Sequence, residues 1–267
     1  MLMSFVAALQ MAAVVGNEPQ AEALRHASER GALIYEFDQA GWVSTDALLK
    51  VAPNPAALGV NGWIVERKQG RDHVVYYTVE GGVPTAVFAA DVDGTRVVST
   101  HLFAQGDDRK LNSVEQRMIA ARSISPSGIP KPCTPGPYNT VVIPPDAPDG
   151  PIDVYLLSAQ TEESVFPLGG QYEFSVDVMG KVTKLRAFSK TCMTMSMPAN
   201  VVAAVATDVL DESPNEIQVY LSLSMKRPYF VSMVATGQTW KVDGEQITLA
   251  KSGSADLPPQ AQDGRKQ

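Results

Sequence analysis

Short runs of strand-forming residues, separated by turn residues, recur from residue 62 onward and limit the possible folds more than any other feature of the chain. In the first half these runs cover residues 62–66, 73–79, 84–91 and 95–103. Asp93-Gly94 joins the last two runs, and Asp-Gly favours the positive φ angles of a tight hairpin turn. The pattern therefore predicts an antiparallel meander.

A proline-rich segment, residues 123–137, separates this meander from the second half of the chain. Its prolines are too many for a helix or a strand, so the segment is predicted to be a stiff connector between two domains. Beyond it, strands separated by turn residues favour a sandwich or an open barrel. The predicted strands cover residues 138–143, 152–158, 171–178, 181–188, 201–210, 216–223 and 229–234, followed by a hairpin through Asp243-Gly244.

Helical patterns are confined to the first half. Apolar residues near helical spacing predict a helix over residues 19–38, although Gly31 favours a break in it. Ser44 or Thr45 can cap a second short helix, which Pro53 and Pro55 would end. A third is predicted from residue 114 to residue 122, capped by Asn112 or Ser113.

These elements predict an α+β fold in which N-terminal helices with an antiparallel meander precede an all-β, sandwich-like or open-barrel domain. The predicted organisation is a signal peptide (residues 1–23), an α+β domain (24–122), the connector (123–137), a β-rich domain (138–251) and a disordered tail (252–267).

The first 16 residues read MLMSFVAALQMAAVVG, an apolar stretch of signal-peptide length that is too short to span a bilayer as a helix. Small residues offer cleavage sites after Gly16 and after Ala23. No Lys or Arg precedes the apolar run, so the alternative is an apolar first helix of the folded domain. We expect export to the periplasm or the medium, and no stable membrane span.

The two cysteines, Cys133 and Cys192, are consistent with export. They form an even pair, which an oxidising compartment would join as a structural disulfide. A metal site at either cysteine would need a second Cys or a His nearby, and neither has one within five residues. No metal is expected.

The net charge of −7, with no basic stripe, argues against a nucleic-acid partner. Asp91-Val92-Asp93-Gly94 resembles the start of a calcium loop, but position 102, where the distal Glu would stand, is Leu. Gly81-Gly82 and Gly169-Gly170 lack the helix N-terminus that would hold a phosphate. No cofactor is predicted.

The three histidines are His26, His73 and His101. His73 and His101 lie in predicted strands, where a histidine without a neighbouring carboxylate is more often a partly exposed sheet residue than a catalytic base. No nucleophile motif of the G-x-S-x-G type is present. The sequence therefore leaves the catalytic residues unknown.

Aromatic side chains, including Trp42, Trp63 and Trp240, either line a cleft for sugars or peptides or pack the sheets, and packing is the commoner role. The segment from Phe166 to Gly170, between two strands, is predicted to be an exposed contact loop.

Two resemblances accompany these patterns. Residues 132–145, with residues 154–157 and the hairpin from Gly169 towards Cys192, resemble uncharacterised exported bacterial proteins. This resemblance covers the second half and implies export and the disulfide, but no activity. Residues 172–177 followed by Gly180-Lys181-Val182 are similar to a hairpin in periplasmic domains of the TonB type. The helix expected directly after that hairpin is absent from the pattern.

Two functional hypotheses follow. The first is a non-enzymatic binding or scaffold protein of the cell envelope, with an unidentified protein or small-molecule partner. The second is an envelope hydrolase whose site gathers Ser or Asp residues around His73 or His101.

Overall fold

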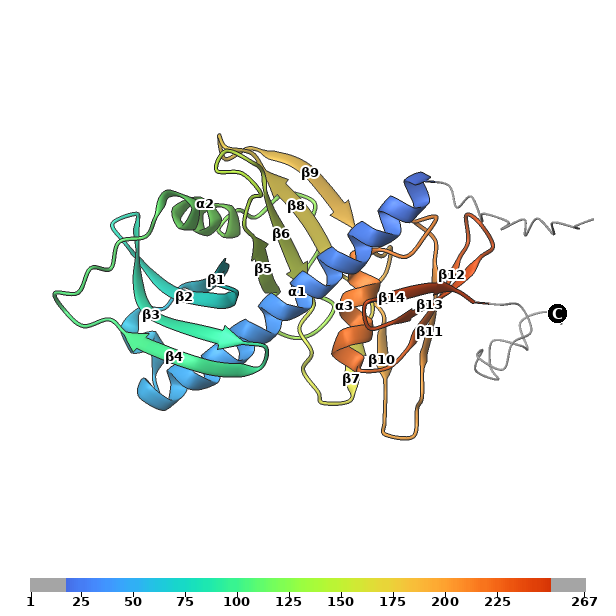
Figure 1. Cartoon of the computed structure of the whole chain (residues 1–267), viewed down its shortest axis with the longest axis horizontal. Coiled ribbons are helices and arrows are strands. Elements are labelled where there is room, and N and C mark those ends of the chain that lie inside the picture. The colour runs from blue at the N-terminus through green and yellow to red at the C-terminus, as the bar shows by residue number, and fades with distance from the viewer. Residues whose placement is uncertain (1–17, 251–267) are drawn as a thin grey trace, which may run out of the picture.

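The computed structural model describes residues 18–250 of the chain. It places three open four-stranded sheets and a two-stranded ribbon along one long helix (Figure 1). This helix, α1 (Glu18–Val51), runs diagonally across the view, between the sheet of strands β1–β4 (residues 62–102) and the sheet of strands β11–β14 (residues 204–249). The predicted α+β class is confirmed.

α1 is a single helix of 34 residues, about 50 Å long at 1.5 Å per residue, so the predicted break at Gly31 is wrong. Gly31 is buried against the helix α3 (Glu216–Met225), where a Cβ would lie 2.5 Å from the Glu216 carbonyl oxygen and from Val219 Cβ. Glycine at this position allows two helices to approach closely and is not a helix break.

The prediction of a separate second helix is also wrong, because α1 continues through Ser44 and Thr45. Neither residue caps a helix. The Ser44 hydroxyl donates to the Ala40 carbonyl oxygen at 2.6 Å, and the Thr45 hydroxyl donates to the Gly41 carbonyl oxygen at 2.7 Å. Their pattern resembled a cap because Ser and Thr can bond the backbone in either way.

The first sheet is the predicted meander, with strands in the order β1-β2-β3-β4, all antiparallel. Its strands are β1 (Gly62–Lys68), β2 (Arg71–Glu80), β3 (Val83–Asp93) and β4 (Arg96–Leu102), preceded by the short 3₁₀ helix η1 (Pro55–Leu58). The predicted third helix is confirmed as α2 (Ser113–Arg122). The side chain of Asn112 accepts from the Glu115 N–H, and that of Glu115 accepts from the Asn112 N–H.

Residues 123–137 form no helix or strand, as their prolines predict. The second sheet follows, antiparallel and in the order β5-β6-β8-β9, with a ribbon of β7 and β10 beside it. These strands are β5 (Asn139–Ile143), β6 (Ile152–Leu157), β7 (Val165–Pro167), β8 (Tyr172–Val176), β9 (Val182–Ala187) and β10 (Thr194–Ser196).

The third sheet corrects a prediction, because residues 216–223 are not a strand but part of the helix α3 (Glu216–Met225). Ile217, Val219 and Leu221 alternate with polar neighbours and so imitate a strand. A capping box at Asn215 stabilises the helix instead. The Asn215 side chain accepts from the Gln218 N–H, and the Gln218 side chain accepts from the Asn215 N–H.

α3 is the crossover that lets β11 (Ala204–Asp208) and β12 (Tyr229–Met233) pair in parallel. Two antiparallel strands, β13 (Thr239–Asp243) and β14 (Gln246–Leu249), complete the sheet and form the hairpin predicted at Asp243-Gly244.

Buried residues on the two sides of the connector pack together. α1 and the first sheet share one hydrophobic cluster with the second and third sheets, and α2 shares another with β1, β2 and the second sheet. The division into two domains stays a prediction, as do the signal peptide and the tail, which fall largely or wholly outside the described residues. Within residues 18–250, no helix is long and apolar enough to cross a membrane.

Candidate functional site

A cleft of about 420 Å³ opens where α1 and α3 meet the start of β5 and the segment after β6. We call it the acidic cleft, because α1 contributes Asp38 and Asp46 to its wall. The other lining residues are Tyr35, Gln39, Trp42 and Val43 from α1, Asn139, Ser158, Ala159, Gln160, Phe166 and Pro167 from the strands and loops, and Tyr220, Leu221, Ser224 and Lys226 from α3 and its end.

Asp38 occupies the buried stripe of α1, between Ile34 and Gly41. It is 4% exposed. The Asn139 amide donates to Asp38 Oδ1 at 2.5 Å, and the Tyr220 hydroxyl donates to Asp38 Oδ2 at 3.2 Å. Three elements that are distant in the sequence therefore meet at this one carboxyl group.

Burial raises the pKa of Asp38 to about 6, and the hydrogen bond from Tyr220 offsets part of this rise. The same burial, together with the neighbouring carboxylate, raises the pKa of Tyr220 well above its usual value. Tyr220 therefore stays protonated near neutral pH and keeps donating to Asp38.

Asp38 is the one buried acid of residues 18–250 that has neither an ion pair nor a hydrogen bond from a backbone N–H group. Four buried acids lie within 4 Å of a Lys or Arg nitrogen: Asp72 with Arg67, Glu115 with Lys68, Glu173 with Lys184 and Glu216 with Arg186. A fifth, Asp208, accepts from the backbone N–H groups of Leu210 and Asp211. Asp38 makes no ion pair, and its hydrogen bonds come from Asn139 and Tyr220.

The rim of the cleft carries a large aromatic ring. Trp42 is 58% exposed and stands one turn of α1 after Asp38. Packing in the core explains the position of Trp240, which is buried, but not that of Trp42.

The two serines of the cleft make hydrogen bonds to the backbone. The Ser158 hydroxyl donates to the Gly170 carbonyl oxygen, and the Ser224 hydroxyl donates to the Tyr220 carbonyl oxygen.

The predicted histidines lie elsewhere, since none of the three lines the acidic cleft. His73 Nδ1 is 2.7 Å from Asp91 Oδ1, across the β2–β3 pair. The Ser99 hydroxyl donates to the other oxygen of Asp91 at 2.6 Å, and these two bonds lower the pKa of Asp91. The carboxylate thus stands between the serine and the histidine, whereas a catalytic triad needs the histidine in the middle.

His101 contacts Asp107, with Nε2 3.3 Å from Oδ2, and its side chain is 58% exposed. His26 lies on α1 and lines two other hollows, close to Arg30 and Arg186. The structure therefore does not bring the three histidines together.

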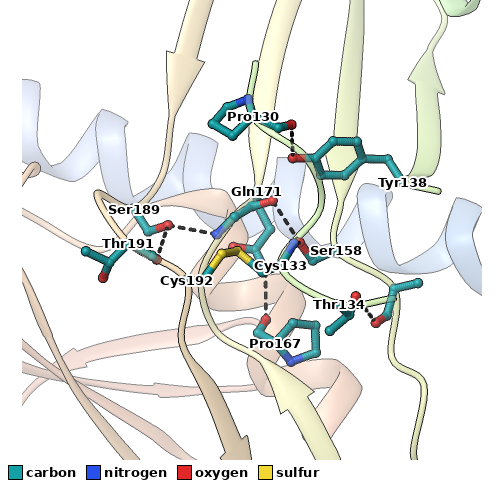
Figure 2. The surroundings of a disulfide bond; sticks show 12 residues. Pro130, Cys133, Thr134, Tyr138, Ser158, Pro167, Gln171, Ser189, Thr191 and Cys192 are labelled. Atoms are coloured by element: carbon teal, nitrogen blue, oxygen red, sulfur yellow. Dashed lines mark hydrogen bonds between the residues drawn. A yellow bond between two sulfur atoms is a disulfide. The ribbon is translucent and has the colours of Figure 1, made fainter. Parts of the chain in front are cut away.

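The predicted disulfide between Cys133 and Cys192 is present (Figure 2). The segment from Phe166 to Gly170 passes beneath it and is buried, so the prediction of an exposed contact loop is wrong. A Cβ at Gly170 would lie 2.2 Å from Cys133 Sγ, and its φ of +80° favours glycine. The tight fit under the disulfide explains Gly170, which the sequence showed only as a turn residue.

Hydrogen bonds fix the surroundings of the disulfide. The Cys133 N–H donates to the Ser158 hydroxyl oxygen at 3.1 Å, and the Gly170 N–H donates to the Ser189 hydroxyl oxygen at 2.8 Å. Ser158 also lines the acidic cleft. The disulfide therefore helps to hold one wall of the cleft in place.

A second hollow, of about 500 Å³, lies beside α3 and β11. Its acid, Asp208, is bound by the Gln218 amide at 2.6 Å in addition to two backbone N–H groups. These hydrogen bonds explain why a carboxylate is buried at Asp208: it holds the loop after β11 in place. Across residues 18–250, no three His, Cys, Asp or Glu side chains gather in a metal-binding arrangement.

Comparison of the chain with protein-family models, with curated proteins and with solved structures gave no match. Function must therefore be argued from the acidic cleft itself. Sequence analysis did not single out Asp38, Asn139 or Tyr220. One available signal was an aspartate within an apolar helical stripe, where Ala27, Gly31, Ile34, Asp38 and Gly41 follow each other at intervals of three or four.

Proposed function

We propose that this protein is an exported binding protein of the cell envelope that holds a small polar molecule in the acidic cleft. The observation that carries the proposal is Asp38, a buried carboxyl group paired only with neutral donors at the wall of an open cleft. An apolar residue in the same stripe would avoid the desolvation of a carboxylate, which costs several kcal/mol. Departures from local rules of this kind are expected at functional sites.

The chemistry of the cleft favours binding over catalysis. Both serine hydroxyls donate to carbonyl oxygens, so neither is hydrogen-bonded to a base that would activate it. The remaining polar groups, Asn139, Gln39 and Gln160, are amides suited to hydrogen bonding. A volume of about 420 Å³ falls in the range of small-molecule sites.

The proposal that the protein acts outside the cytoplasm rests on the apolar N-terminal stretch and on the disulfide, which persists in oxidising compartments. Intact-mass analysis of protein from envelope and soluble fractions of its host tests this. Export predicts loss of about 16 or 23 residues and two cysteines that alkylate only after reduction. A full-length chain with two free thiols would contradict it.

Thermal-shift measurements test the binding function. The panel would contain primary amines, neutral sugars, dicarboxylates and dipeptides, each added to the purified wild-type protein. We expect at least one class to raise the melting temperature, since a ligand that binds only the folded state stabilises it.

Two tryptophan substitutions locate the binding. Ala159→Trp fills the acidic cleft, whereas Val202→Trp places the same ring at a site that is already 74% exposed. Binding in the cleft predicts that the shift disappears in Ala159→Trp and persists in Val202→Trp. No shift with any class, or an unchanged shift in Ala159→Trp, would refute the proposed function.

The alternative function, an envelope hydrolase, is favoured by one contact, the 2.7 Å hydrogen bond between His73 and Asp91. Hydrolysis of a chromogenic ester by the wild type, lost in His73→Gln and kept in His101→Gln, would support it. Equal rates in the wild type and His73→Gln would remove His73 as the centre of such a site.

A further inference from the structure

We infer that the acidic cleft selects small ligands that carry a protonated amine next to an apolar group; this inference rests on the binding function proposed above. The juxtaposition that carries it is a buried carboxylate without an ion pair that shares one cleft with four aromatic side chains.

The first step concerns charge. A carboxylate has about four acceptor positions, and the hydrogen bonds from Asn139 and Tyr220 fill one on each oxygen of Asp38. Both donors are neutral, and Asp38 has no Lys, Arg or His within 4 Å in the part of the chain that the structure describes. An ammonium group would supply N–H donors to the remaining positions and the missing positive charge.

The second step concerns the aromatic side chains. Tyr35, Trp42 and Tyr220 line the same cleft as Asp38. The face of such a ring attracts a cation, and proteins that recognise ammonium groups commonly surround them with aromatic rings. Because Trp42 is 58% exposed, its ring is available to a ligand at the rim.

The third step concerns anionic ligands, which the charges of the cleft disfavour. The charged side chains that line the cleft are Asp38 and Asp46 on α1 and Lys226 at the end of α3. Two acids against one base disfavour an anionic ligand such as a carboxylate or a phosphate. Val43, Phe166 and Leu221 add apolar surface to the same walls, so an amine with a short apolar part suits the cleft better than a bare cation.

The proton and the ammonium group should compete for Asp38. Tyr35 and Tyr220, the other groups lining the cleft whose acidity is altered, have pKa values raised by burial and do not ionise in the neutral range. Below about pH 6 the protonated form of Asp38 predominates, and amine affinity should then fall by up to tenfold per pH unit.

Isothermal titration of the full mature protein with two probes of similar shape tests the inference. Benzylammonium carries the charge and benzyl alcohol does not. We expect benzylammonium to bind at least tenfold more tightly at pH 7.5, and its affinity to fall as the pH is lowered from 7 to 5. Both measurements use the wild type, so they do not depend on the folding of a variant.

Asp38→Asn removes the charge and keeps the shape, and Asp149→Asn removes a charge from an exposed loop outside the cleft. We expect the first to weaken benzylammonium binding at least tenfold and the second to leave it unchanged. Equal binding of the two probes, or amine affinity that Asp38→Asn leaves intact, would overturn the inference.

The outcomes also separate the inference from the function on which it rests. If neutral sugars bind in the cleft and amines do not, the binding function stands and the amine selectivity is refuted. If no class in the thermal-shift panel binds, both are refuted.

Discussion

The altered acidity of Asp38 predicts a pH-dependent stability that Asp38→Asn should remove. The pKa of this carboxyl group rises from its ordinary value of 3.8 to about 6 in the folded protein because the group is buried. Between these two pH values the folded state holds a proton that the unfolded state has released. Stability therefore falls as the pH rises through this window, and it levels off above about pH 6.

The size of this effect follows from the same two values. Each pH unit between them is worth about 1.4 kcal/mol, and the unfolded aspartate is already half ionised near pH 4, so ionisation of Asp38 should cost about 2.4 kcal/mol of folding free energy at pH 7 relative to pH 4. Asp72, whose pKa burial also raises to about 6, contributes a similar trend but is present in both proteins. The difference between the wild type and Asp38→Asn therefore isolates Asp38.

Urea denaturation of both proteins from pH 4 to pH 8, with the disulfide intact, measures this difference. We expect the stability of the wild type relative to Asp38→Asn to fall by about 2.4 kcal/mol between pH 4 and pH 7. A difference that is constant with pH would refute the reasoning, since it would mean that Asp38 has the same acidity in the folded and unfolded chain.

Three further predictions concern the frame that holds the cleft. Gly31→Ala should destabilise the protein by about 2 kcal/mol in urea denaturation, because the added Cβ would lie 2.5 Å from Val219 Cβ and from a backbone oxygen; an unchanged midpoint would show that α1 and α3 can move apart freely. Replacing Cys133 and Cys192 together by serine should cost about 4 kcal/mol, from the loop entropy of a separation of 59 residues. Asn215→Ala should cost about 1 kcal/mol through loss of the α3 cap, read as a lower melting temperature.

Local rules were sufficient where a short segment determines its own structure. Asp93-Gly94 fixed a hairpin tip, and the N–H groups at the start of α2 found their acceptor in Asn112, as the sequence predicted. The disulfide followed from an even pair of cysteines. In each of these cases the deciding contacts lie within a few residues or follow from composition.

The predictions were wrong where contacts or hydrogen bonds that the local pattern does not show determine the structure of a segment. An isolated helix would be weakened at Gly31, but in the fold the missing Cβ makes room for α3, nearly 190 residues later. The segment from Phe166 to Gly170 has the composition of a surface loop, yet the Cys133–Cys192 bridge covers it. At Ile217 to Leu221 the alternation of apolar residues fits a strand, and the hydrogen bonds of Asn215 outweigh it.

The acidic cleft combines both situations. The aspartate in the apolar stripe of α1 is a local signal, because burial of a carboxyl group on a helix is costly and has to be offset by specific contacts or by a function. Its partners are not local: Asn139 follows Asp38 by 101 residues and Tyr220 by 182. The sequence can therefore show that Asp38 is unusual, but only the fold shows that its partners are neutral, and the proposed amine selectivity rests on that property. If Asn139 or Tyr220 were a lysine, the same aspartate would be one more balanced structural ion pair, like Glu216 with Arg186.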